Sequence, residues 1–241
     1  MDKKRHLKKF ENISTYESQK DEVMGMPHVV LLEDTKEVVY ASENNNEGIT
    51  FYEMVDLGLP SGIKWANMNV GATSETDFGL FFQWGDTVGY TQAQVENGEK
   101  EFSRPNYKWY DGSENTMTKY NDTDGKTELD AEDDGVRVHM GGDWRLPTST
   151  NIEELIANTN YEYTTIDGIE GGKFTNKSDS SKYIFLPGAG YENGYFYLGI
   201  TFFSWSSSLY DDLINYAQCL DGSTIANFAR YSGLPLRGVV G

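Results

Sequence analysis

The chain has 241 residues, the size of one large domain or of a small and a medium domain together. Its single cysteine, Cys219, excludes an intramolecular disulfide, and no apolar stretch approaches the roughly 18 residues of a membrane span. The net charge of −18 repels phosphate backbones and anionic lipid headgroups, which argues against nucleic acid and membrane surfaces as partners.

The N-terminus begins with a basic run at residues 2–9. A signal peptide would continue into an apolar core, but residues 10–15 are mostly polar, so we predict no signal peptide. Ser14 and Glu17 have the spacing of a capping box, which predicts a short helix from Ser14 to about Met24.

Two runs rich in β-branched residues, 28–33 and 37–41, predict a β-hairpin. The polar segment 42–48 has the composition of a linker. We therefore predict an N-terminal anchor or oligomerisation module at 1–48 and a main domain at 49–241. The first module is too small to be stable alone, so it is expected to pack against the main domain or another chain.

The main domain alternates short apolar runs with Gly, Asn and Asp turns, and residues 89–135 are long, polar and without periodicity. Few helices and many short strands predict an α+β, loop-rich fold. The predicted strands lie at 51–57, 63–68, 78–84, 183–187, 196–205 and in the tail up to residue 240.

One strong helix is predicted from Thr150 to Asn158. Its apolar residues Ile152, Leu155 and Ile156 fall on one helical face. Thr150 and Glu153 have capping-box spacing at its start.

Seven sequence blocks follow one another in order between residues 55 and 240. They are VDLGLPSGIKWA (55–66), NVGA (69–72), FQWGDT (82–87), LDAEDD (129–134), GGDWRLPT (141–148), IFLPGAGY (184–191) and WSSSLY (205–210). Together they resemble the Fibrobacter succinogenes major paralogous domain, found in Bacteroidales proteins and their phages.

This resemblance implies a C-type-lectin-like fold for 49–241, a binding scaffold whose variable surface lies on loops of its C-terminal part. Four tryptophans lie inside the shared blocks and are expected in the core: Trp65, Trp84, Trp144 and Trp205. The family pattern ends in an Arg-Pro-Val-like signature. Residues 236–239 read Leu-Arg-Gly-Val instead, which leaves the register of the last strand open.

The N-terminal segment carries a second resemblance, at 9–11, at 16–17 and in the hairpin predicted from His28 to Tyr40. It is similar to a segment that opens many virion proteins of Bacteroides phages. This implies a virion protein assembled in the host cytoplasm, whose N-terminal segment binds other virion proteins. The absence of a predicted signal peptide agrees with that route.

A third resemblance concerns the stretches 211–215 and 225–229, which follow the Trp-Ser-Ser-Ser-Leu block. They are similar to the mutable positions of variable proteins made by diversity-generating retroelements, which share the lectin-like fold. The alternative is ordinary divergence of a surface loop.

Aromatic residues make up 14% of the chain, and 16 of them are tyrosines. Tyrosine offers a flat apolar face and a polar tip, which suits stacking on sugars or anchoring a protein contact. We predict a ligand-binding surface near the C-terminus, the alternative being that half of its aromatic residues are core. Its members are Tyr210, Asp211, Asp212, Tyr216, Asp221, Asn227, Phe228 and Tyr231.

The acidic stretch within 121–134 is the best candidate for a metal site, because calcium prefers clustered carboxylate oxygens. We predict Asp122, Asp124 and Asp130 as its ligands. The spacing fails that of an EF-hand, and the Glu-Pro-Asn and Gln-Pro-Asp motifs of calcium-dependent lectins do not occur. The alternative is a solvated acidic loop whose carboxylates cap turns.

Catalytic patterns are weak. The Gly125-Lys126-Thr127 run lacks the earlier glycine of a phosphate loop, and the serine run 206–208 has no nearby histidine. A catalytic triad would have to use His28 or His139. We therefore predict a protein that is not an enzyme and needs no cofactor, calcium apart.

The leading hypothesis is a virion fibre or decoration protein, a dimer or trimer, whose lectin-like domain binds a glycan or protein of the bacterial host surface. One alternative is a purely structural capsid or tail decoration protein. Others are a bacterial surface adhesin or fimbrial tip component, and a carbohydrate-active enzyme.

Overall fold

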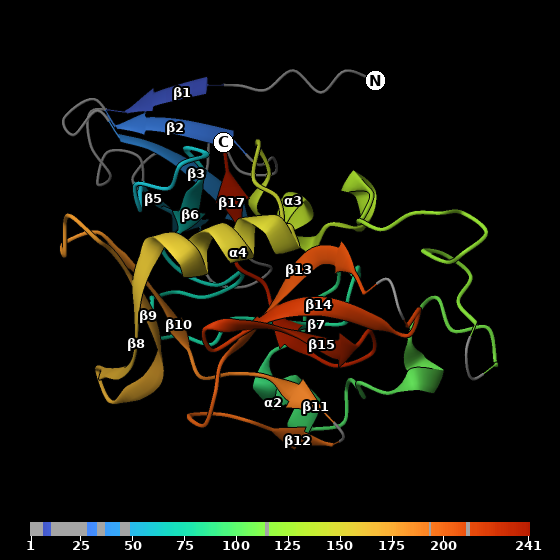
Figure 1. Ribbon diagram of the computed structural model, residues 1–241. Coiled ribbons are helices and arrows are strands. Elements are labelled where there is room, and N and C mark those ends of the chain that lie inside the picture. The colour runs from blue at the N-terminus through green and yellow to red at the C-terminus, as the bar shows by residue number, and fades with distance from the viewer. Residues whose placement is uncertain are drawn as a thin grey trace.

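The structure is a computed structural model of the chain (Figure 1). It describes the backbone alone for residues 7–10, 28–32, 37–43, 49–51 and 192. Backbone and side chains are described for 52–113, 116–191, 194–210 and 213–241. The predicted helix from Ser14 to Met24 lies outside these residues.

The N-terminal strands form a four-stranded sheet in the order β1-β2-β3-β4 (Figure 1). The strands are β1 (Leu7–Phe10), β2 (His28–Leu32), β3 (Glu37–Glu43) and β4 (Ile49–Tyr52). β2 and β3 are antiparallel, so the predicted hairpin is confirmed, and β1 runs parallel to β2. β4 starts where the main domain was predicted to begin, yet it pairs with β3, so the sheet crosses that boundary.

The C-terminal strands return to pair with the first strands of the main domain. β17 (Val239–Val240) pairs with β6 (Lys64–Ala66), and β6 pairs with β5 (Met54–Val55). β16 (Leu234–Pro235) pairs in the same way with β7 (Phe81–Phe82). The register of the last strand, left open by the sequence, is therefore Val239 opposite Trp65.

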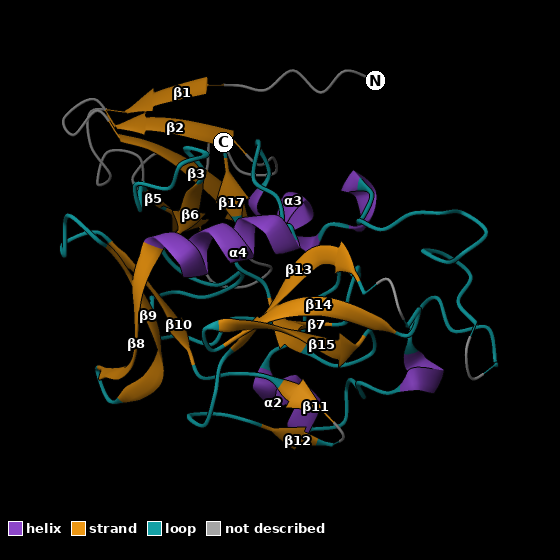
Figure 2. Ribbon diagram, viewed as in Figure 1, coloured by secondary structure: helices purple, strands orange, loops and turns teal. Residues whose placement is uncertain are grey.

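Helices are few among the described residues, and the sheet-rich α+β class is confirmed (Figure 2). The helices are α2 (Gln92–Glu96), α3 (Gly135–Met140) and α4 (Ser149–Asn158), with 3-10 turns at Arg104–Asn106 and Ala131–Asp133. The predicted helix is confirmed as α4, but its predicted capping box is wrong. Thr148 is the N-cap and exchanges hydrogen bonds with Asn151, because the helix starts one residue earlier than its apolar periodicity indicates.

Two three-stranded antiparallel sheets flank α4 (Figure 1). One has the order β10-β9-β8, from β8 (Thr159–Ile166), β9 (Ile169–Asn176) and β10 (Tyr183–Pro187). The other has the order β13-β14-β15, from β13 (Phe203–Leu209), β14 (Tyr216–Asp221) and β15 (Thr224–Ala229). A short hairpin of β11 (Tyr191–Glu192) and β12 (Tyr195–Phe196) lies between them in the sequence.

Two predicted strands are each divided in the structure. The predicted strand 51–57 is split at Glu53 into β4 and β5. The predicted strand 196–205 is interrupted between β12 and β13, where Gly199 has a φ of 67° that no regular strand contains. The strand predicted at 183–187 is confirmed as β10.

The four tryptophans expected in the core are each 0% exposed. Two of them use their indole N–H to join strands that are distant in sequence. Trp84 donates to the carbonyl of Ser206 and Trp205 to that of Phe82, both at 2.9 Å. Each tryptophan therefore fills core volume and also fixes the position of β13 against the β7 region.

Arg237, in the segment 236–239 just before the C-terminus, is fully buried. Its guanidinium donates to the side chain of Asn69 at 3.0 Å and to the carbonyls of Ala66 and Phe185 at 3.0 and 2.7 Å. Burial lowers the pKa of this guanidinium to about 9. Arg237 thus joins the β6 segment, β10 and the C-terminus.

Candidate functional site

The predicted ligand-binding residues divide between the two faces of the β13-β14-β15 sheet. Tyr216 lies opposite Ala229, and Gln218 lies opposite Asn227, so Tyr216 and Asn227 share one face. Phe228 lies opposite Ala217 and therefore points to the other face. The structure brings Tyr216 and Asn227 together and separates Phe228 from them.

Phe228 is half-buried and packs against the core. Its ring centre lies 4.6 Å from that of Phe203, which in turn contacts Tyr197 at 6.1 Å. This aromatic row lies on the face of the sheet opposite to Tyr216. Phe228 thus contributes to packing, as the core alternative for the aromatic residues anticipates.

The other predicted members lie apart from Tyr216. Asp221 is at the opposite end of β14, about 17 Å away at the usual rise per residue, and accepts a hydrogen bond from Thr201 at 3.2 Å. Tyr231 is half-buried, with the Arg104 guanidinium 5.5 Å from its ring centre. Asp211 and Asp212 lie outside the described residues.

A turn at residues 213–216 leads into β14 and places Leu213 beside Tyr216. The Tyr210 amide donates to the Tyr216 carbonyl at 3.2 Å, and the Tyr216 amide donates to the Leu213 carbonyl at 2.9 Å. The Leu213 side chain is 54% exposed and that of Tyr216 36% exposed. We define the display face as Leu213, Tyr216, Gln218 and Asn227.

The buried residue Arg230 holds the backbone of this turn at Ile214 and Asn215. It is 0% exposed, and its guanidinium donates to the carbonyl of Ile214 at 3.0 Å. It also donates to the carbonyls of Lys119 at 3.0 Å and Tyr120 at 3.2 Å. The Arg230 amide donates to the carbonyl of Asn215 at 2.9 Å. One side chain thereby ties the turn to the long polar segment predicted at 89–135.

Four aromatic rings surround the Arg230 guanidinium. Its carbon lies 4.7 Å from the ring centre of Trp84, 5.3 Å from Trp109, 5.4 Å from Tyr107 and 5.9 Å from Tyr120. The Tyr107 hydroxyl accepts from Arg230 Nε at 3.0 Å, and burial raises the pKa of that hydroxyl. Among the described residues, ring faces and neutral oxygens are the contacts that stabilise this buried cation. Sequence reasoning missed Arg230, because its partners are scattered between residues 84 and 214.

The acidic stretch does not gather the three predicted metal ligands. The Asp124 carboxylate accepts from the amides of Tyr120, Asn121 and Lys126 at 2.6 to 3.0 Å, so it caps a turn. Asp122 is exposed. Only Asp130 of the predicted set joins a cluster, together with Glu132 and Asp133.

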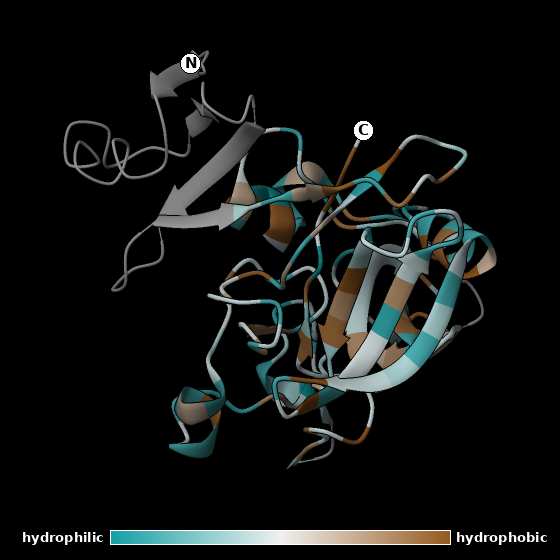
Figure 3. Ribbon diagram, turned by 90° about the vertical axis from the view of Figure 1, so that its left-hand side faces the viewer, coloured by the Kyte–Doolittle hydropathy of each residue, from teal (hydrophilic) through white to brown (hydrophobic). Residues whose placement is uncertain are grey.

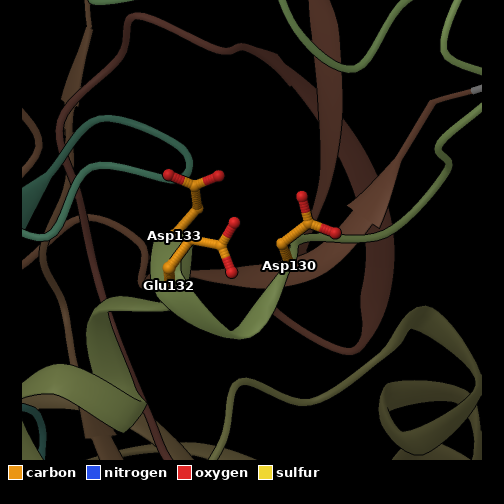
Figure 4. Close-up of side chains that lie close together, drawn as sticks. All are labelled: Asp130, Glu132 and Asp133. Atoms are coloured by element: carbon orange, nitrogen blue, oxygen red, sulfur yellow. The ribbon is translucent and has the colours of Figure 1, made fainter. Parts of the chain in front are cut away.

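Figure 4 shows the carboxylates of Asp130, Glu132 and Asp133 close to one another. The Lys119 ammonium lies among them, 2.7 Å from Asp130, 2.5 Å from Asp133 and 3.6 Å from Glu132. Its hydrogen bonds to Asp130 and Asp133 raise the pKa of Lys119, so it stays charged. Lys119 thus supplies the positive charge that a metal ion would bring to these carboxylates.

The catalytic candidates have structural contacts. His139 Nε2 lies 3.0 Å from the Thr87 carbonyl, its ring packs edge-on to Phe82, and burial lowers its pKa. The serines 206–208 are buried in β13, where the Ser206 hydroxyl donates to the Gln218 carbonyl at 2.7 Å. Cys219 is buried as well. The described partners of these side chains are those of a folded core.

Comparisons with protein-family models, curated proteins and solved structures find no match to this chain. Within the described residues, each helix is too short or too polar to cross a bilayer.

Proposed function

We propose that this chain is a non-enzymatic binding protein of a phage particle, whose domain is C-type-lectin-like and binds a glycan or protein of the bacterial host surface. Its N-terminal strands attach it to other virion proteins. The observation that carries this proposal is the turn before β14, which exposes Leu213 and Tyr216 while Arg230 fixes the backbone beneath them.

The chemistry of the display face suits a polar ligand with a flat apolar side. The Tyr216 ring is partly exposed, and the amide side chains of Gln218 and Asn227 lie on the same face. An aromatic ring stacks on the apolar face of a sugar, and amides both donate to and accept from hydroxyl groups. The same pairing of ring and amide also anchors protein contacts.

The hydrogen bonds of Arg230 to the turn favour a role in binding, because they hold the turn in one conformation. Ordering a loop on binding costs conformational entropy, and a turn held in place by hydrogen bonds has already lost most of it. The acidic character of the chain, −18 overall, favours a neutral or basic ligand over an anionic one. A small face of this kind binds weakly by itself, so many copies on one particle supply the avidity.

Binding to intact Bacteroidales cells and to a glycan array tests the proposal. Wild type is compared with Tyr216→Ala and Asn227→Ala, each checked for folding by circular dichroism. Tyr195→Ala is the matched control, because Tyr195 is 72% exposed on a different hairpin, β11–β12. We expect the first two variants to lose binding and the control to keep it.

Equal binding by all variants would move the site away from the display face. No binding by a folded wild type to any cell or glycan would contradict receptor recognition. If such a protein still assembled into particles, the structural decoration alternative would hold instead. Repeating the assay with a chelator separates a calcium-dependent mode from a direct one.

A further inference from the structure

The outer edge of the β10-β9-β8 sheet is formed by β8 (Figures 1 and 3). β8 pairs with β9 along its whole length, from Thr159 opposite Asn176 to Ile166 opposite Ile169. In the described part of the chain, no strand pairs with its other side. The sheet therefore ends in an edge strand of 8 residues.

The backbone groups at this edge follow from the turn that joins β8 to β9. Asp167 and Gly168 both have positive φ, 48° and 83°, as a two-residue type I′ turn requires. Ile166 and Ile169 therefore form a hydrogen-bonded pair, and such pairs alternate along the ladder. Tyr161, Tyr163 and Thr165 consequently direct their N–H and C=O groups away from β9.

These outward groups have no described partner. Among the described residues, no hydrogen bond from another segment reaches the backbone of Tyr161, Tyr163 or Thr165. The Tyr163 side chain beside them is 42% exposed.

β8 also lacks the usual protection of an edge strand. Natural edges carry lysine, proline or a bulge that prevents pairing with another chain. β8 has none of these, and its register with β9 is continuous. Its only charge, Glu162, lies opposite Lys173 of β9, which offsets it.

We infer that β8 is an interface for a second copy of this chain, pairing antiparallel with the partner's β8 about a twofold axis through Tyr163. The strand is self-complementary in this register. Tyr163 lies opposite the partner's Tyr163, and Tyr161 lies opposite the partner's Thr165. Each of Tyr161, Tyr163 and Thr165 thus finds an outward-facing partner.

Charge and length select this register over its neighbours. With the axis at Glu162, two carboxylates would lie directly opposite each other, which is destabilising. With the axis at Thr164, Tyr161 would face the turn and not a strand. With the axis at Tyr163, Glu162 faces the partner's Thr164, and the two Tyr163 rings can contact each other. The result is one continuous sheet across two copies, independent of any ligand of the display face.

A cysteine at the axis tests the register directly. Opposed residues of a hydrogen-bonded antiparallel pair have Cα atoms about 5.5 Å apart, within the range of a disulfide. We expect Tyr163→Cys to form a disulfide-linked dimer under mild oxidation on a non-reducing gel. Thr165→Cys is the control, because its copy in the partner lies four residues away along the strand. The native Cys219 is 0% exposed and does not interfere.

A second pair of variants tests the backbone contact without cysteine. Thr165→Pro removes an outward N–H and leaves the hydrogen bonds to β9 intact, as is tolerated at an edge. Thr165→Ala keeps that N–H. By light scattering after gel filtration in about 0.15 M salt, where charge repulsion is screened, we expect wild type and Thr165→Ala to be dimers and Thr165→Pro a monomer.

A monomeric wild type with no cross-link at Tyr163→Cys would overturn the inference. So would a dimer that Thr165→Pro leaves unchanged, because its interface would then lie elsewhere. The cross-linking result does not depend on the folding of the proline variant. It is also separate from the cell-binding assay, so this interface and the proposed function can fail independently.

Discussion

The guanidinium carbon of Arg230 lies 4.7 Å from the ring centre of Trp84. This contact joins a residue near the C-terminus to a tryptophan more than a hundred residues earlier, inside a core where both are 0% exposed. The hydrogen-bond partners described for the guanidinium are the Tyr107 hydroxyl and backbone carbonyls. The shape of the guanidinium therefore matters here as much as its charge.

Replacing this side chain by another cation should destabilise the protein. Arg230→Lys keeps the charge but cannot reach several carbonyls at once, and each buried acceptor left unpaired costs about 1–3 kcal/mol. We expect the free energy of unfolding to fall by about 2–4 kcal/mol in urea titrations. Arg137→Lys keeps the charge at a partly exposed side chain whose guanidinium lies 3.6 Å from the Asp134 carboxylate, and should change it by about 1 kcal/mol or less. An equal loss of stability in the two variants would contradict the structural role of the Arg230 guanidinium.

The position of Gly172 in β9 predicts a steric effect. A Cβ atom built there would lie 1.9 Å from the Phe202 ring, closer than any real contact. We expect Gly172→Ala to lower the free energy of unfolding by about 1–3 kcal/mol, the usual range for an overpacked core. Adding Phe202→Leu should recover part of that loss. A double mutant less stable than the sum of the single mutants would exclude this contact as the cause.

The acidic cluster predicts a pH dependence. Hydrogen bonds from Lys119 and Lys126 lower the pKa of Asp130 from 3.8 to about 2. A depressed pKa means that the unfolded chain takes up this proton first, so the stabilisation is present above about pH 4 and is lost as pH falls towards 2. Asp130→Asn should therefore destabilise the protein at about pH 5 and have much less effect at about pH 2.5.

Urea unfolding at the two pH values measures this difference. Asp122→Asn, an exposed side chain of the same loop, is the matched control and should have a small effect at both. A destabilisation by Asp130→Asn that is independent of pH would contradict the electrostatic explanation.

Calcium should not stabilise this protein. The Lys119 ammonium already lies between Asp130 and Asp133, and three backbone amides occupy the carboxylate of Asp124. We expect the same thermal unfolding temperature in millimolar calcium chloride and in chelator. A metal that binds only the native state would raise that temperature with concentration, and such a rise would refute the expectation.

Local patterns in the sequence predicted local structure well. Apolar periodicity placed α4 to within one residue, and β-rich runs placed β2, β3 and β10. The capping residue was misassigned because Thr148 and Thr150 both offer a side-chain oxygen, and periodicity does not choose between them. The four tryptophans were expected in the core and are buried.

The candidate site depended on information that is less local. The two-residue turn at Gly222–Ser223 fixes the register of β14 and β15, and this register alone separates Tyr216 from Phe228. A glycine followed by a serine between two apolar runs is itself a hairpin signal in the sequence. Arg230 gave no such signal, because its ring and carbonyl partners are spread over more than a hundred residues and only the folded chain brings them together.

The two buried arginines make completion of the core depend on the last residues to be synthesised. Arg230 and Arg237 bind segments near residues 66–69, 107–120 and 185, and β16 and β17 pair with β7 and β6. A ribosome delivers those earlier segments first, so their carbonyls stay hydrogen-bonded to water until residues 230–240 emerge. The part of the core that packs on Arg230 can form only after the C-terminus has been synthesised, and until then Trp84, Trp109 and Tyr120 remain apolar surface that chaperones can bind.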